Sequence, residues 1–191
     1  MQYTVLAVVS YLMGSVPFAY IFTKRLRGLD IRKIGSRNVG TTNVMLRAGW
    51  LPGILTAIGD AGKGMLAVSF ARVSIPGSEV AELVALLFAI IGHNWPVWLN
   101  FHGGGGLATY IGGMFLISIC VVLLLLAIWA AAFLATCHKY LSAVFTCAIM
   151  PVVLAVTKGT WHHIPLGLGL GAALGAKQVT AWIRFARGYV R

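Results

Sequence analysis

The residues best suited to chemistry lie in one polar stretch, residues 34–47, which reads I-G-S-R-N-V-G-T-T-N-V-M-L-R. It contains hydroxyl, amide and guanidinium side chains together with glycine, and no acidic residue. Glycine lets neighbouring backbone N–H groups point at one position, and arginine binds phosphate oxygens in a bidentate manner. We therefore predict an anion site formed by Ser36, Asn38, Thr42, Asn43 and Arg47. The alternative is a cytoplasmic loop that is basic only because of membrane topology.

Four consecutive glycines form a second candidate for anion binding: Gly103, Gly104, Gly105 and Gly106. They precede an apolar segment that we expect to be helical. Backbone N–H groups at a helix N-terminus attract anions because the helix dipole is positive there. Glycine runs also serve as hinges, so this run alone does not decide. His93, shortly upstream, is either a hydrogen-bonded structural residue or a proton relay.

Two charged residues, Asp60 and Lys63, interrupt an otherwise apolar segment. Charges within a membrane span are costly, so they usually face the protein interior and pair. A spacing of three places both side chains on one helical face, where they can form an ion pair. We expect Asp60 to be structural, because a carboxylate beside a phosphate would repel it. Lys63 is a candidate phosphate ligand.

The composition is that of an integral membrane protein, with 59% hydrophobic and 10% charged residues, whereas soluble domains have about 25% charged residues. The 15 basic residues against 4 acidic ones fit loops that face an anionic cytoplasmic leaflet, together with an anionic ligand. We expect no nucleic-acid partner. The three cysteines are widely spaced in apolar segments, so we expect neither a disulfide nor a metal site.

The apolar segments predict an all-α integral membrane protein with a single polytopic domain, residues 1–191. The first segment, 3–22, is long enough to span the bilayer, and we expect a kink at Pro17. The basic residues that follow place the next loop in the cytoplasm, and therefore the N-terminus outside. These residues are Lys24, Arg25, Arg27, Arg32, Lys33, Arg37 and Arg47.

Residues 107–136 are too long for one span, and charge decides how they cross. Two short helices that meet near residues 118–120 would place Lys139 and the C-terminal arginines inside, as the positive-inside rule requires. We therefore predict about seven transmembrane helices, some short or bent, with the N-terminus outside and the C-terminus cytoplasmic. The other expected spans are 51–73, 83–99, 141–156 and the glycine-rich 164–183, and the C-terminal arginines are Arg184, Arg187 and Arg191.

Three motifs together carry a resemblance to a known family. They are G-S-x-N-x-G-x-T-N at 35–43, D-x-x-K-G at 60–64, and G-H-x-x-P-x-x-x-x-F-x-G-G-x-G-x-A-T at 92–109. In this order and spacing they resemble the PlsY family of bacterial glycerol-3-phosphate acyltransferases. The combination is far more specific than any one motif.

The resemblance implies a seven-helix enzyme of the bacterial inner membrane, with its active site on the cytoplasmic side and no cofactor. Such an enzyme moves a fatty acyl group from acyl phosphate to the 1-hydroxyl of sn-glycerol 3-phosphate, giving lysophosphatidate and phosphate for phospholipid biosynthesis. Its partners are these two substrates and membrane lipids. In this interpretation Ser36, Asn43 and Arg47 hold a phosphate, the glycine N–H groups stabilise the oxyanion and His93 relays a proton.

The chain departs from the family pattern at several positions. The family has a lysine where this chain has Gly105, and its motif arginine at the position of Leu46, one residue before Arg47. A histidine and an asparagine near the family's C-terminus have no counterpart here. Lys63, Arg37 and Lys177 are the candidate replacements for the missing charge. The alternatives to an acyltransferase are a catalytically weak relative that binds phosphate or lipid, and a small anion transporter.

Overall fold

The computed structural model describes residues 1–186, so the predicted C-terminal arginines Arg187 and Arg191 lie outside the described residues. Every regular element within this range is helical, which confirms the all-α prediction. The α-helices are α1 Gln2–Ser15, α2 Phe18–Arg27, α3 Thr41–Ala48, α4 Trp50–Ser74, α5 Glu79–Asn94, α6 Leu107–Ile117, α7 Ile119–Thr136, α8 Lys139–Lys158 and α9 Ile164–Ala186. Short 3-10 helices cover Ile31–Lys33, Val97–Leu99 and Trp161–His163.

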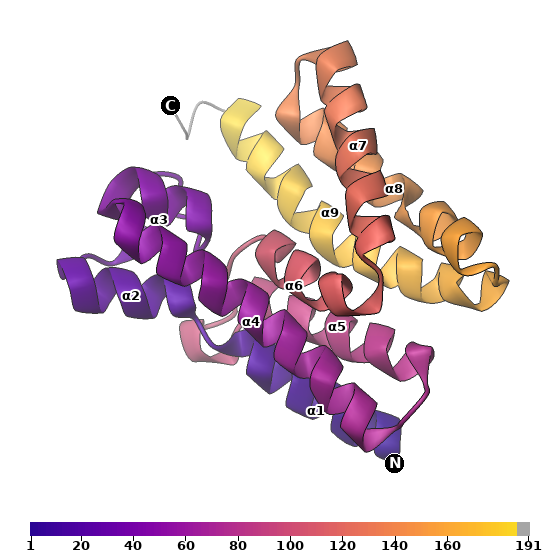
Figure 1. The fold of residues 1–191 in the computed structure, drawn as a ribbon. Coiled ribbons are helices and arrows are strands. Elements are labelled where there is room, and N and C mark those ends of the chain that lie inside the picture. Colours follow the sequence, from indigo (N-terminus) through magenta and orange to yellow (C-terminus); the bar gives the residue numbers. More distant parts are fainter. Residues whose placement is uncertain (187–191) are drawn as a thin grey trace.

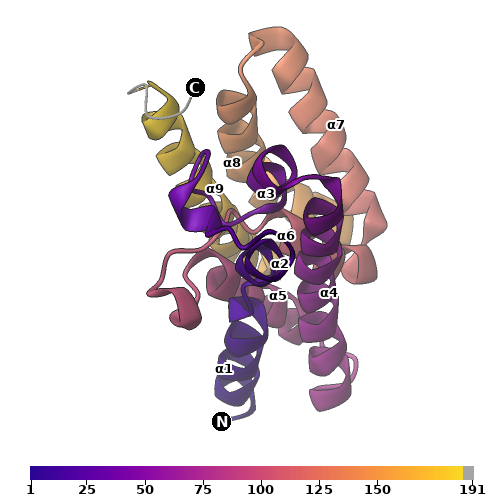
Figure 2. The ribbon, with the colours of Figure 1, turned by 90° about the vertical axis from the view of Figure 1, so that its left-hand side faces the viewer.

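The helices form two groups that meet along α5. Helix α1 packs on α5 and α4 packs on α6, while α8 packs on both α7 and α9. Contacts of α5 with α9 and of α6 with α7 join the two groups. Figures 1 and 2 show α2 and α3 at one end of the molecule, together with the C-terminal end of α9 and opposite the N-terminus. The polar stretch therefore lies at the end away from residue 1.

Five helical stretches in the described part of the chain are long and apolar enough to cross a membrane. They are Gln2–Arg27, Trp50–Ser74, Glu79–Leu99, Ile119–Thr136 and Lys139–Lys158. Helix α6 is also apolar but shorter, with 11 residues. The count of seven spans and their orientation therefore stay predictions.

The first apolar segment is broken at Pro17, as predicted. Val16 and Pro17 are non-helical, and α2 begins only at Phe18. A residue before proline is sterically driven away from the helical region, so the helix ends at Ser15. The break exposes the Val16 carbonyl oxygen, which accepts a hydrogen bond of 3.0 Å from the Lys63 ammonium.

The segment 107–136 divides into two helices at Ser118, also as predicted, with Ser118 in an extended conformation. Cations from other helices bind the carbonyls that this break leaves open: Arg72 donates to Leu116 at 2.7 Å, and Lys158 to Ile117 at 3.4 Å. The same two cations pair with carboxylates of the first turn of α5, Arg72 with Glu82 and Lys158 with Glu79.

Glycines allow close helix contacts in both groups. A Cβ on Gly64 of α4 would lie 2.0 Å from the Thr109 carbonyl oxygen of α6. A Cβ on Gly171 of α9 would lie 2.3 Å from the Cys147 carbonyl oxygen of α8. The glycine-rich last segment therefore packs closely on α8, and both contacts are typical of small residues between membrane helices.

Candidate functional site

The polar stretch folds around the side chain of Asn43, which lies in the first turn of α3. The Asn43 amide oxygen accepts the Ser36 N–H at 3.1 Å, and its amide nitrogen donates to the carbonyls of Asn38 at 3.0 Å and Ile34 at 3.2 Å. Its exposed fraction is only 5%. The predicted phosphate ligand Asn43 thus has its amide oxygen and nitrogen hydrogen-bonded to the loop backbone, and these bonds hold the loop in shape.

The remaining predicted residues of the stretch lie around this loop and are open to solvent. Ser36 is half-buried, and its hydroxyl oxygen accepts the Asn38 N–H at 3.5 Å. Asn38, Thr42 and Arg47 are exposed. Arg47 lies against Gly35, because a Cβ there would be 2.8 Å from the Arg47 Nε. The structure therefore brings hydroxyl, amide and guanidinium groups together on one exposed surface.

The start of this loop is held by an ion pair outside the membrane-spanning segments. Arg32 forms a bidentate contact with Asp30, at 3.0 Å from Nε and 2.8 Å from Nη2. Its guanidinium carbon lies 4.8 Å from the Tyr20 ring centre. The hydrogen bonds from Arg32 lower the pKa of Asp30 to about 2. The carboxylate therefore stays ionised at any physiological pH.

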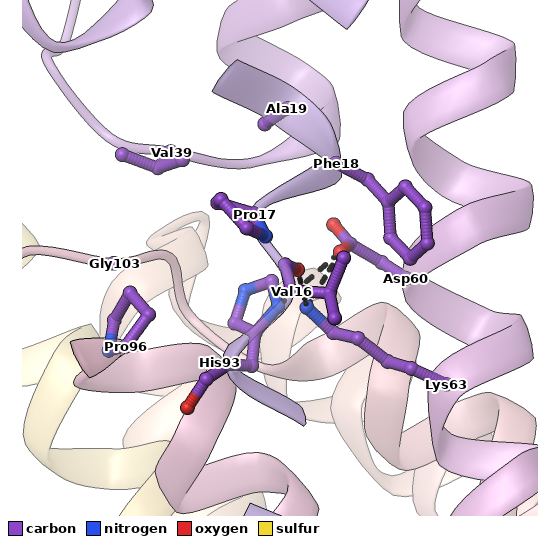
Figure 3. A pocket seen from close by; sticks show the side chains of 11 residues that line it. Val16, Pro17, Phe18, Ala19, Val39, Asp60, Lys63, His93, Pro96 and Gly103 are labelled. Carbon is purple, nitrogen blue, oxygen red and sulfur yellow. Dashed lines mark hydrogen bonds and ion pairs between the residues drawn. The ribbon is translucent and has the colours of Figure 1, made fainter. Parts of the chain in front are cut away.

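Asp60, Lys63 and His93 form a buried charge cluster beneath the loop (Figure 3). Lys63 Nζ lies 2.9 Å from Asp60 Oδ1, which confirms the predicted ion pair. His93 Nδ1 lies 3.4 Å from the same oxygen, but the two atoms do not have the geometry of a hydrogen bond. All three are at most 6% exposed. Lys63, a predicted phosphate ligand, contacts Asp60 and the Val16 carbonyl, so the cluster joins α4, α5 and the α1–α2 break.

The glycine loop, residues 103–106, uses half of its N–H groups internally. Gly103 donates to the Asn94 carbonyl at 3.2 Å, and Gly104 donates to the His93 carbonyl at 3.1 Å. These two N–H groups continue the hydrogen bonding at the C-terminal end of α5. In the described structure no hydrogen bond engages the N–H of Gly105 or Gly106.

Gly104 is the point at which the three motifs meet. A Cβ on it would lie 2.2 Å from the His93 Nε2 and 2.4 Å from the carbonyl oxygen of Val39, which belongs to the polar stretch. A cavity of about 10 Å³ beside it is lined by Val39, Asp60, Lys63, His93 and Gly103, among others. That is about the volume of one water-sized probe. The cavity is too small for a substrate.

The glycerol-3-phosphate acyltransferase family model matches residues 4–188 of this chain. The chain belongs to the glycerol-3-phosphate acyltransferase family. A glycerol-3-phosphate acyltransferase of Carboxydothermus hydrogenoformans is 39% identical over 168 residues, covering 88% of this chain and 85% of the relative. One of Sinorhizobium fredii is 45% identical over 148 residues, covering 77% and 71%.

Two crystal structures of PlsY (YgiH), described as an integral membrane glycerol 3-phosphate acyltransferase, share the fold. Its glycerol 3-phosphate form has a TM-score of 0.83 at 27% identity, and its lysophosphatidic acid form a TM-score of 0.80 at 28% identity. Each comparison covers 100% of this chain and 95% of the other. The chain therefore has the fold of a multi-pass membrane protein of this family.

Two contacts of this family member's site escaped the sequence reasoning. Asn94, fully buried, donates from its amide nitrogen to the Ala173 carbonyl of α9 at 2.7 Å. Tyr11 of α1 donates to the Trp95 carbonyl at 2.9 Å. Asn94 lies beside His93 in an apolar helix, and a buried amide in such a helix usually marks a contact between helices. The sequence shows the asparagine in an apolar segment, but it does not show that its partner is the Ala173 carbonyl.

Proposed function

We propose that the protein is a membrane glycerol-3-phosphate acyltransferase that uses acyl phosphate as its donor. It transfers a fatty acyl group to the 1-hydroxyl of sn-glycerol 3-phosphate and gives lysophosphatidate and phosphate. The observation that carries the proposal is the likeness of the whole chain to PlsY in both its glycerol 3-phosphate and its lysophosphatidic acid form. The family match over residues 4–188 supports it.

The proposed reaction needs no covalent nucleophile, because phosphate is already a competent leaving group. The 1-hydroxyl oxygen bonds to the acyl carbon, the bond from that carbon to the phosphate oxygen breaks, and the hydroxyl proton passes to the released phosphate or to water. Positioning and charge stabilisation are then sufficient for catalysis. Lysophosphatidate leaves into the membrane lipids.

The ion pairs of the structure support catalysis by positioning. All four carboxylates of the chain lie close to a cation: Asp30 to Arg32, Asp60 to Lys63, Glu79 to Lys158, and Glu82 to Arg72. A carboxylate in an ion pair is a poor general base because its charge is already stabilised. We therefore assign no carboxylate base to the reaction.

We assign phosphate binding to the exposed groups around the loop. Ser36 and Arg47 are the principal ligands, with Asn38, Thr42 and the N–H groups of Gly105 and Gly106 completing the shell. Asn43, Gly103 and Gly104 shape the loops. His93, behind Gly104 and beside Asp60, positions the glycine loop, and we assign the proton relay to its Nε2, which faces Gly104.

The proposed location is the inner membrane of a bacterium, with the active site on the cytoplasmic side. Lys24, Arg25 and Arg27 are exposed at the end of α2, at the same end of the molecule as the polar stretch. The positive-inside rule places such residues in the cytoplasm. The phosphorylated, water-soluble substrate would then reach the site from the cytosol.

The test is an assay of the purified protein in lipid nanodiscs with acyl phosphate and glycerol 3-phosphate. We expect phosphate and lysophosphatidate to appear in equal amounts and only when both substrates are present. Nanodiscs without the protein serve as the inactive control. Substrate-dependent turnover no greater than that of the empty nanodiscs would contradict the proposal and favour the catalytically weak relative. Faster turnover with acyl coenzyme A would contradict the assigned donor.

A further inference from the structure

The glycine loop has no cationic side chain of its own, although a phosphate dianion at Gly105 and Gly106 calls for one. Two of the three candidate cations are poorly placed to supply it. Lys63 is 3% exposed and binds Asp60 and the Val16 carbonyl. Arg37 is exposed in the polar stretch, and no described contact joins it to the glycine loop. The third candidate, Lys177, lies on α9.

Helix α9 forms a wall beside the glycine loop, and its position there is fixed. The hydrogen bond from Asn94 to the Ala173 carbonyl ties it to the last turn of α5. A Cβ on Gly106 would lie 3.3 Å from the Leu174 side chain, and a Cβ on Gly105 would lie 3.9 Å from the Gln178 amide nitrogen. Ala173, Leu174 and Gln178 of α9 therefore lie on the side that faces the loop and the end of α5.

Lys177 belongs to this wall, one helical turn beyond Ala173. Its ammonium nitrogen lies 5.1 Å from the centre of the Trp95 ring, at the C-terminal end of α5. It also lies close enough to His93 for an electrostatic interaction with the ring. A lysine has a flexible stem of four carbons, so its ammonium can reach a ligand above the loop without movement of the helix.

We propose that Lys177 is a phosphate-binding residue of the site, which contacts a phosphate monoester dianion held at the N–H groups of Gly105 and Gly106. In this chain the positive charge beside the glycine loop comes from α9 instead of the loop. Trp95 holds the ammonium near the site through its ring face when no phosphate is bound. Gln178 lines the same wall. This inference rests on the proposed acyltransferase function and adds a binding residue to it.

The test compares Lys177→Met, which keeps an apolar stem against Trp95, with Lys177→Arg in the phosphate-release assay. We expect Lys177→Met to raise the KM of at least one phosphate substrate by about tenfold or more, with a smaller effect on kcat. A higher KM for glycerol 3-phosphate assigns Lys177 to the acceptor, and a higher KM for acyl phosphate assigns it to the donor. Lys177→Arg retains the charge and is expected to retain most of the affinity.

A sharper test moves the positive charge from position 177 to position 105 and measures the affinity again. The nearest atom to a Cβ on Gly105 is 3.9 Å away and belongs to a side chain, so the position has room for a lysine. The double variant Gly105→Lys with Lys177→Met is expected to recover at least half of the lost affinity in logarithmic terms. Lys139→Met is the matched control, because Lys139 also lies over an aromatic ring, that of Tyr140 at 5.0 Å, but at the start of α8.

Failure of this inference is distinguishable from failure of the proposed function. An active wild-type protein whose Lys177→Met variant has unchanged KM values for both substrates would overturn the inference and leave the function intact. If the wild-type protein is inactive, the inference is tested by the binding of inorganic phosphate, measured as the rise in melting temperature of the protein in nanodiscs. Weaker stabilisation of Lys177→Met than of Lys139→Met supports the inference, and equal stabilisation overturns it.

Discussion

Lys63 Nζ lies 2.9 Å from Asp60 Oδ1 inside α4, where both side chains are almost fully buried. The Lys63 ammonium also binds the carbonyl that the break at Pro17 exposes. The ion pair therefore supplies a hydrogen-bond donor to the carbonyl left free by the helix break, and its carboxylate lies beside His93, below the glycine loop. It thus connects residues of the second and third motifs.

Breaking this pair on one side is expected to destabilise the protein strongly. Lys63→Met leaves the Asp60 carboxylate without its main partner in an apolar surrounding, which costs about 3–5 kcal/mol. The double variant Asp60→Leu with Lys63→Met removes both charges and is expected to be more stable than Lys63→Met alone. Thermal unfolding in nanodiscs measures the order. A double variant less stable than the single one would contradict a compensating ion pair.

Removing the proposed phosphate ligands is expected to reduce turnover without unfolding the protein. Ser36→Ala and Arg47→Ala should each lower kcat/KM for glycerol 3-phosphate at least tenfold, a loss of about 1.4 kcal/mol of transition-state stabilisation. Arg37→Ala is the matched control, since Arg37 is an exposed arginine next to Ser36. Equal losses in Arg37→Ala and Arg47→Ala would point to a general charge effect instead of a site.

Asn43→Asp tests the structural role of this residue. The substitution keeps the size but replaces the amide donor with a carboxylate, which repels the Ile34 and Asn38 carbonyls. An unsatisfied buried group costs about 1–3 kcal/mol, so both the melting temperature and the turnover should fall. Asn38→Asp, at an exposed position nearby, should leave the melting temperature unchanged. Loss of activity at full stability in Asn43→Asp would assign Asn43 to direct substrate binding.

The pH dependence of the loop follows from the Asp30–Arg32 pair. The pKa of Asp30 in the folded protein is about 2, below the usual value of 3.8. The unfolded chain therefore takes up a proton first as the pH falls, and the stabilisation, complete above pH 4, is lost between about pH 4 and pH 2. Asp30→Asn should abolish this contribution. Measurement of unfolding across that range tests the window, and an unchanged slope in the variant would contradict it.

The orientation in the membrane is testable with terminal tags. We expect an N-terminal tag to be accessible from outside the cell and a C-terminal tag from the cytoplasm, because an odd number of spans separates them. Protease protection of both tags in spheroplasts gives the answer. Both tags on the same side would require an even number of spans.

Much of this architecture is readable in the sequence because it depends on local rules. Proline excludes a helical residue before it, and a spacing of three brings Asp60 to Lys63; these rules hold in any fold. The convergence of the three motifs was predicted from their family resemblance. Even so, the sequence alone does not show that Gly104 closes the contact between His93 and Val39.

The sequence does not show the hydrogen-bond partners that only the fold supplies. Asn43 and Lys63 have side chains suited to phosphate, and in the fold Asn43 also binds the Ile34 and Asn38 carbonyls, while Lys63 binds the Val16 carbonyl. The N–H groups of Gly103 and Gly104 are used in the same way by the end of α5. The carbonyl partners come from a chain reversal or from another helix, and residue type and spacing do not encode such partners.

Helix α6 has 11 residues and is therefore about 16 Å long, roughly half of the hydrocarbon thickness of a bilayer. The glycine loop precedes it, and the Arg72 and Lys158 side chains hold its other end. Because α6 is held at both ends, we expect its length to set the distance between the glycine loop and the break at Ser118. A thicker or thinner bilayer then has to deform around the protein, so the membrane whose lipids this enzyme would supply also exerts a mechanical load on its α6.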